Sequence, residues 1–291
     1  MTLATLNTAN FAEMAHAMGI SSDMNNASSK ASTLPRLRIW NSAVMGQIEV
    51  KGKLKNVEVV PVGMYRLQQP DGSFVYAENV EIRVFVQRFM HLRYVPDERS
   101  YVKTVMAEDL NSDLRDNVGT FNCGKPVGFD TKFKDLPKDR QDFIQSCKRV
   151  RVLMGQVKLI NALDAQGNEI ETEVSPFIWE IKNTEAFKEM GVPFNTMGRQ
   201  KRLPIHHWIK CGTVMRTNDA KTNNWYVPTQ TIDWKDNVDL AEEDHQIFSD
   251  FMEWIGNYNE YIVNAHKEKG ATKVSQDDAT LVDEFIDIDG E

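Results

Sequence analysis

Short runs in which apolar and polar residues alternate fill the chain between residues 36 and 235, and this pattern constrains the fold more than any other feature. Alternation with a period of two gives a β-strand one apolar and one polar face. Runs 47–51, 55–60 and 80–85 show it clearly. Pro70-Asp71-Gly72 has the chemistry of a tight turn, because proline fixes φ and glycine accepts positive φ. Many short strands joined by polar turns predict an antiparallel barrel or sandwich.

Residues 36–235 are therefore interpreted as one β-rich body. Further strands are predicted at residues 38–40, 65–67, 74–76, 150–160, 176–181, 205–214 and 225–232. Residues 110–142 are rich in glycine, aspartate and lysine and contain few alternating runs. We therefore expect one long insertion, with a helix near residues 137–147. The predicted fold class is mainly β with flanking helices.

The segments on either side of this body follow other patterns. Residues 1–35 predict an N-terminal arm, in which apolar residues at helical spacing over 8–19 precede a linker rich in serine and asparagine. Residues 236–270 predict an amphipathic helix packed on the body, with Asp239 as its cap and Gly270 at its end. Residues 271–291 lose this periodicity and are expected to form a disordered acidic tail.

Charge is distributed unevenly along the chain. The net charge of −8 hides a body of +6, with 30 Lys and Arg against 24 Asp and Glu, and a segment of −13 over residues 236–291. A basic body with an acidic end suggests that the body binds a polyanion and that the tail makes an interaction. The alternative is a chance segregation of charge combined with a solvated helix.

The tail is also unusual in composition. From Asp277 to Glu291 it holds seven acids and no base, together with five large apolar residues that a purely solubilising tail would not need. Such a peptide can dock in a basic groove lined by apolar residues on a partner, or lie over the body's own basic surface. The residues expected to bind a partner are Asp283, Glu284, Phe285, Ile286, Asp287, Ile288 and Asp289.

Cations and aromatic residues are interleaved in four clusters of the body. Single-stranded nucleic acid is held by cations along its backbone and by aromatic faces that stack on bases. A basic strand face is more often merely solvated and an aromatic residue in a strand is more often core, so the four clusters argue together rather than singly. The candidate DNA-binding residues are Trp40, Lys51, Lys53, Lys55, Tyr65, Arg83, Phe85, Arg88, Phe89, Arg93, Tyr94, Lys103, Lys148, Arg149, Arg151, Arg199, Lys201, Arg202, Trp208, Trp225 and Tyr226. Trp179 belongs to the same pool of stacking candidates.

Catalytic and metal-binding patterns are not found in the sequence. It contains no P-loop, no G-x-G-x-x-G, no G-x-S-x-G and no H-E-x-x-H, so we expect a binding protein without cofactor rather than an enzyme. No C-x₂-C pair exists, and His206 and His207, adjacent in an expected strand, would point to opposite faces, which argues against a metal site. Three scattered cysteines fit a reducing compartment, and no apolar run is long enough for a membrane span. A cytoplasmic protein without membrane contact is expected.

This organisation resembles that of the replication-type single-stranded-DNA-binding proteins of tailed bacteriophages. The resemblance rests on the basic and aromatic body, the strand pattern and the acidic segment Asp277–Glu291. It implies an oligonucleotide-binding barrel with a long insertion, which binds single-stranded DNA without strong sequence preference in the host cytoplasm during replication or recombination. It also implies that the tail recruits replication or recombination proteins, while the N-terminal arm can serve self-association. A strand-annealing recombination protein and a virion-associated structural protein remain alternatives.

Overall fold

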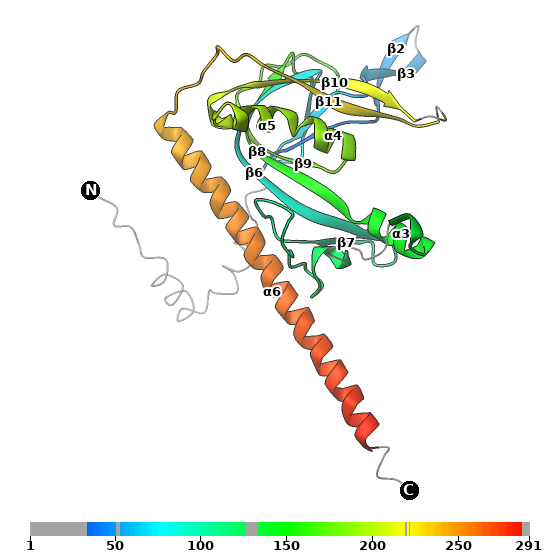
Figure 1. Cartoon of the computed structure of the whole chain (residues 1–291). Coiled ribbons are helices and arrows are strands. Elements are labelled where there is room, and N and C mark those ends of the chain that lie inside the picture. Colours follow the sequence, from blue (N-terminus) through cyan, green and yellow to red (C-terminus); the bar gives the residue numbers. More distant parts are fainter. Residues whose placement is uncertain (1–33, 51–52, 126–132, 219, 221, 287–291) are drawn as a thin grey trace, which may run out of the picture. The chain divides into compact units, whose positions relative to one another are not determined.

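The computed structural model describes residues 34–50, 53–125, 133–218, 220 and 222–286, with the backbone alone at 48–50 and 271–286. Pro35–Glu291 form one compact unit, to which the described elements in Figure 1 belong. The predicted helix at 8–19 and the linker after it lie outside the described residues. None of the described helices combines the length and the apolar character that a membrane span requires.

The unit is mainly β with a long helix after the last strand, which confirms the predicted fold class at this level. A nine-stranded sheet has the order β11-β10-β6-β8-β9-β1-β4-β5, and β7 pairs with the second half of β6. β1 runs parallel to β9, whereas the other neighbours are antiparallel. The described strands do not close this sheet into a barrel. Its strands are β1 (Arg36–Ile39), β4 (Tyr65–Gln68), β5 (Phe74–Ala77), β6 (Asn79–Val95), β7 (Ser100–Lys103), β8 (Lys148–Ile160), β9 (Ser175–Ile181), β10 (Ile209–Thr217) and β11 (Asn224–Ile232).

The long strands β6 and β8 form the centre of the sheet. Their ladder runs from Asn79↔Ile160 to Leu92↔Lys148, with a β-bulge between Val84 and Val86. The predicted strand at 80–85 therefore continues ten residues further, to Val95. Residues 86–92 lack clear alternation because other elements cover both faces of this stretch, and a doubly covered strand carries large side chains on each face.

The main apolar core lies on one face of this sheet. It gathers residues from nearly all strands, including Tyr65, Leu67, Leu153 and Trp179. The hydroxyl of Tyr65 donates to the carbonyl of Gly212 at 3.0 Å, and the hydroxyl of Thr213 donates to the carbonyl of Gly63 at 2.8 Å. These bonds join β4 and the turn before it to β10 across the order of the sheet, so the sheet curls around the core although no ladder among the described strands closes it.

The remaining elements lie outside this sheet. A separate hairpin is formed by β2 (Val44–Val50) and β3 (Lys53–Val60). The predicted helix near 137–147 is confirmed as α3 (Lys138–Ser146). Two short helices, α4 (Thr184–Glu189) and α5 (Val192–Arg199), were not predicted because neither is long enough to show a helical period. Single 3₁₀ turns occur at η1 (Asn122–Gly124), η2 (Phe133–Asp135) and η3 (Pro204–His206).

The predicted strand at 205–214 begins later, at Ile209. Pro204 starts the 3₁₀ turn η3 instead, since proline has no N–H for a sheet ladder. His206 and His207 therefore do not alternate across a strand, and that prediction is wrong. The Nδ1 atom of His206 lies 2.9 Å from the carbonyl of Val238, which ties this turn to the segment leading into the last helix.

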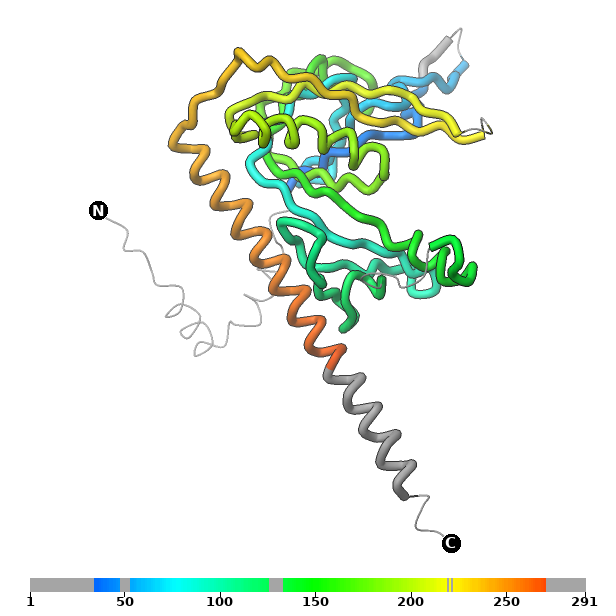
Figure 2. Tube along the Cα trace, viewed as in Figure 1, coloured from blue at the N-terminus to red at the C-terminus, as the bar shows by residue number. Residues whose placement is uncertain are grey.

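That helix, α6 (Glu242–Ile286), is longer than predicted. Figure 2 traces the chain from β11 through residues 233–241 into α6. The helix starts three residues after Asp239, and it continues through Gly270 instead of ending there. A glycine inside a helix costs only about 1 kcal/mol relative to alanine, so it need not end one. The backbone of residues 271–286 is thus helical where a disordered tail was predicted, and residues 287–291 lie outside the described part.

Candidate nucleic-acid interface

Three of the residues expected to contact DNA lie under α6. Arg83 is 5% exposed and pairs with Asp244 of α6. The ring of Phe85 packs edge-on against Phe251, with 6.1 Å between the centroids. Arg88 contacts the Sδ of Met252 at 3.7 Å. These three side chains therefore attach α6 to the sheet. The spacing of Arg83, Phe85 and Arg88 in the sequence could not show that a distant helix covers them.

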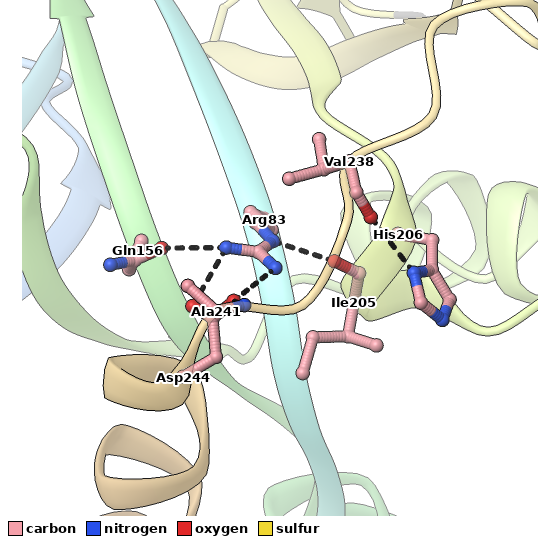
Figure 3. Close-up of polar contacts among 7 residues, drawn as sticks. All are labelled: Arg83, Gln156, Ile205, His206, Val238, Ala241 and Asp244. Atoms are coloured by element: carbon pink, nitrogen blue, oxygen red, sulfur yellow. Dashed lines mark hydrogen bonds and ion pairs between the residues drawn. The ribbon is translucent and has the colours of Figure 1, made fainter.

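Arg83 forms the main polar anchor of α6 (Figure 3). Its two terminal nitrogens donate to the two carboxylate oxygens of Asp244, at 2.8 and 2.7 Å, and its Nε donates to the carbonyl of Ile205 at 2.6 Å. Burial alone would raise the pKa of Asp244, but hydrogen bonds from Arg83 and from the backbone N–H of Ala241, together with the charge of Arg83, outweigh it and lower that pKa. The carboxylate stays ionised at neutral pH.

The β-bulge shifts the alternation of side chains along β6 by one residue, so even-numbered and odd-numbered residues exchange faces beyond it. Before the bulge, Val84 faces the apolar core. After it, Arg88 faces α6, while Phe89 packs on Phe187 of α4, with ring centroids 5.9 Å apart. Phe89 stands opposite Arg151 of β8. The bulge therefore places Phe89, rather than Arg88, on the α4 side of the sheet.

A cleft opens beside Phe187. The α3–α4 cleft, of about 340 Å³, has three cations and no acid among its described lining residues. Lys148 and Arg149 at the start of β8 are exposed there, and the guanidinium carbon of Arg149 lies 5.7 Å from the ring of Phe187. The lining residues are Lys125, Ile144, Gln145, Cys147, Lys148, Arg149, Thr184 and Phe187. The cleft thus combines positive charge with an aromatic face.

Arg151 supports this cleft from beneath. It is 8% exposed, donates to the side-chain carbonyl of Gln87 and to the backbone carbonyl of Phe187, and lies over the rings of Phe89 and Phe187. Burial lowers the pKa of Arg151 to about 10, so it stays charged at neutral pH. Arg151 is therefore a fixed charge below the surface rather than a surface contact.

His91 lies beside the same cations. It is 5% exposed and stands opposite Arg149 in the β6–β8 ladder. Burial, Lys125 and Arg149 together lower the pKa of His91 to about 4, so the imidazole is neutral at physiological pH. Its Nδ1 is buried and has no hydrogen-bond partner among the described residues.

A second cleft, also of about 340 Å³, lies between β1 and β9. The two strands pair at a single register position, Arg36↔Ile178. The β1–β9 cleft carries three cations, Arg36, Arg38 and Lys182, against one acid, Glu180, which pairs with Lys182 at 3.1 Å. Its lining includes residues 181–183 and 186, while the α3–α4 cleft includes 184 and 187, so segment 181–187 forms a wall of both clefts.

Other predicted residues fall at separate places. Tyr65 is fully buried in the core and Trp40 is partly buried. Arg93 donates to the carbonyl of Cys123 at 3.0 Å, and Lys103 is half-buried in β7. Tyr94 is 45% exposed and lies 5.0 Å, centroid to centroid, from Tyr101 on β7.

The rest are spread over the hairpins and α5. Lys53 and Lys55 are exposed on β3, and Arg199, Lys201 and Arg202 are exposed at the end of α5. Lys158 covers the ring of Trp208, Trp225 donates to Glu185, and Tyr226 lines the β1–β9 cleft. Trp179 is core. Lys51, Asp287, Ile288 and Asp289 lie outside the described residues, and Asp283, Glu284, Phe285 and Ile286 are described only as backbone of α6.

Five cationic or aromatic residues of the two clefts were missed from the sequence. Arg36 and Arg38 carry a usable signal, because residues two apart in a strand share a face. Lys125 and Lys182 stand alone in loops, and Phe187 lies in a helix too short to be recognised. The clefts therefore depend on contacts between distant segments.

Metal-binding side chains do not gather in groups of three or more within the described part of the chain. Cys123 and Cys147 are buried, and burial is the main factor that raises the pKa of both thiols. Neither is therefore suited to act as a nucleophile at neutral pH. Comparisons with family models, with curated proteins and with solved structures find no match for this chain.

Proposed function

We propose that the body binds single-stranded DNA with little sequence preference, and that the α3–α4 and β1–β9 clefts hold its backbone. The observation that carries this proposal is the α3–α4 cleft, where Lys125, Lys148 and Arg149 meet with no acid among the described lining residues. Each cation that neutralises a phosphate releases condensed counterions, which favours binding of any sequence.

Aromatic residues beside these cations favour single strands over duplexes. Stacking of a base on an aromatic face contributes about 1–3 kcal/mol and tolerates any base, but a duplex keeps its base faces hidden. Phe187 lines the α3–α4 cleft next to Arg149. The exposed pair Tyr94 and Tyr101 offers a second platform, and Lys182 of the β1–β9 cleft lies 5.6 Å from the ring of Tyr101.

The finer features of the resemblance belong to this proposal. An oligonucleotide-binding barrel is supported by the curl of the sheet, in which Tyr65 and Thr213 bond β4 to β10. A role in viral DNA replication or recombination follows from the resemblance alone, whereas recruitment of partner proteins by the acidic C-terminal segment is supported by the charge segregation of the sequence. Self-association through the N-terminal arm is part of the same proposal.

Fluorescence anisotropy of a labelled oligo-dT strand, titrated with the full chain at several salt concentrations, tests strand binding. For wild type, the logarithm of the binding constant should fall linearly with the logarithm of salt concentration. Arg149→Gln should weaken binding and reduce the magnitude of that slope by about 0.7, the value for one lost phosphate contact on a single strand. Arg115→Gln removes an equal charge from an exposed site that lies outside both clefts and outside the candidate DNA-binding residues, and it should change little.

Two results would overturn the proposal. If wild type fails to bind the strand even at low salt, strand binding itself is wrong. If Arg149→Gln and Arg115→Gln weaken binding equally, the protein attracts DNA through its general charge and the cleft has no special part.

A further inference from the structure

Two arginines face each other on the outer side of β1 and β4. Arg38 and Arg66 are direct partners in this antiparallel pair, and Arg36 stands opposite Gln68 one step further along the same face. Like charges placed directly opposite in a sheet destabilise it. No acid among the described residues forms an ion pair with Arg36, Arg38 or Arg66. The positive charge of this face is therefore not balanced by any ion pair among the described residues.

Arg66 is held rigidly beneath this surface. It is 7% exposed, and its guanidinium carbon lies 3.4 Å from the ring centroid of Trp40 and 4.4 Å from that of Phe74. Burial, and next the charge of Arg38, lower the pKa of Arg66. An arginine nevertheless stays protonated in proteins, so the charge is permanent.

The same site has more hydrogen-bond donors than acceptors. The Nε of Arg66 and the Nε1 of Trp40 are both buried and have no partner among the described residues. Both atoms can only donate. Buried polar atoms without partners are uncommon in folded proteins, and each one points to a role or to an absent acceptor. Here charge and donors together indicate an anion.

We propose that Arg36 and Arg38, above the fixed charge of Arg66, form a phosphate-binding site on the outer face of β1 and β4. Arg36 and Arg38 make the contacts because both are exposed, and Arg66 strengthens the local field from below. Arginine suits this task because its planar fork donates two parallel hydrogen bonds to phosphate oxygens.

This site lies on the path of the proposed strand, and the inference rests on the proposed function. Arg36 and Arg38 also line the β1–β9 cleft, which shares segment 181–187 with the α3–α4 cleft. A strand that fills both clefts therefore delivers its phosphates to Arg38. The binding path then extends from Lys125 at one end to the β1–β4 face at the other.

The test combines two probes on the full chain. The first is oligo-dT anisotropy at several salt concentrations for wild type, Arg38→Gln, Arg149→Gln and the control Arg115→Gln. The second is the thermal unfolding midpoint of wild type, Arg38→Gln and Arg115→Gln with and without inorganic pyrophosphate. We expect Arg38→Gln to raise the Kd for the strand several-fold and to reduce the salt slope by about 0.7. Pyrophosphate should raise the midpoint of wild type and of Arg115→Gln more than that of Arg38→Gln.

The outcomes separate the two proposals. If Arg149→Gln weakens strand binding while Arg38→Gln behaves like Arg115→Gln, strand binding holds and the β1–β4 site is refuted. If no variant binds the strand, the proposed function has failed, and pyrophosphate alone decides on the site. A midpoint shift that Arg38→Gln abolishes then supports a site for free phosphate compounds, whereas an equal shift or no shift in all three proteins refutes it.

Discussion

Asp244→Asn should destabilise the protein more than any other single change of charge on α6. Asp244 is 5% exposed and bonds both terminal nitrogens of Arg83, which is equally buried. Asparagine keeps the shape but loses the charge, so a buried guanidinium is left without a counterion. Breaking a buried ion pair in this way costs about 3–5 kcal/mol. We expect about 3 kcal/mol, near the lower limit, because the asparagine oxygen can still accept one hydrogen bond.

The assay is equilibrium unfolding of the full chain in urea, followed by far-UV circular dichroism. Glu253→Gln is the matched control, since it removes one negative charge from an exposed position of the same helix. The double variant Arg83→Met, Asp244→Leu should recover most of the loss, because neither charge is then left unpaired. A loss below about 1 kcal/mol for Asp244→Asn, or one equal to that of Glu253→Gln, would refute the reasoning.

Three further outcomes follow from particular contacts. Arg38→Gln should raise the free energy of unfolding by about 0.2–1 kcal/mol when no polyanion is present, because it removes the repulsion from Arg66, and unfolding in urea measures this. Gly155→Ala should lower the free energy of unfolding by about 1–3 kcal/mol or more, since a Cβ there would lie 2.0 Å from the carbonyl oxygen of Arg83. Gly256→Ala has open space around it in α6 and should raise the free energy of unfolding by about 0.5–1 kcal/mol, and unfolding in urea measures both changes. The pKa of His91 is about 4 in the folded state, below its unfolded value, so its contribution to the free energy of unfolding is favourable at neutral pH. This contribution is lost as the pH falls from about 6.5 toward 4. The urea midpoint of His91→Gln should therefore depend less on pH in this window than that of wild type.

Most strands could be predicted from the sequence because alternation is a local property. The runs at 55–60, 150–160 and 225–232 correspond to β3, β8 and β11. The failures concern boundaries that distant contacts decide. β6 extends to Val95 because α6 and α4 cover its second half, and α6 passes Gly270 because a single glycine costs too little to end a long helix.

The candidate site was harder to predict, since side chains meet there only through the fold. Sequence clustering placed Arg83, Phe85 and Arg88 together with Phe89, although the bulge sends the first three toward α6 and Phe89 toward α4. It correctly grouped Lys148 with Arg149, which lie side by side in one cleft. It could not join them to Phe187, because no local pattern connects a strand start with a short helix 38 residues later.

The β-bulge at Phe85 sets which side chains of β6 face α4 and which face α6, so the stretch beyond it is sensitive to changes of length. A substitution there alters one side chain, but an in-frame loss of the single codon for Gln87 would shift the strand by one residue and invert every position that follows it. Arg88 and Met90 would then turn toward α4, and Phe89 and His91 toward α6. Insertions and deletions of one residue in this stretch should therefore be eliminated far more strictly during evolution than substitutions. Related chains, however divergent in composition, are expected to keep the number of residues from Val86 to Leu92, over which β6 pairs with β8 beyond the bulge.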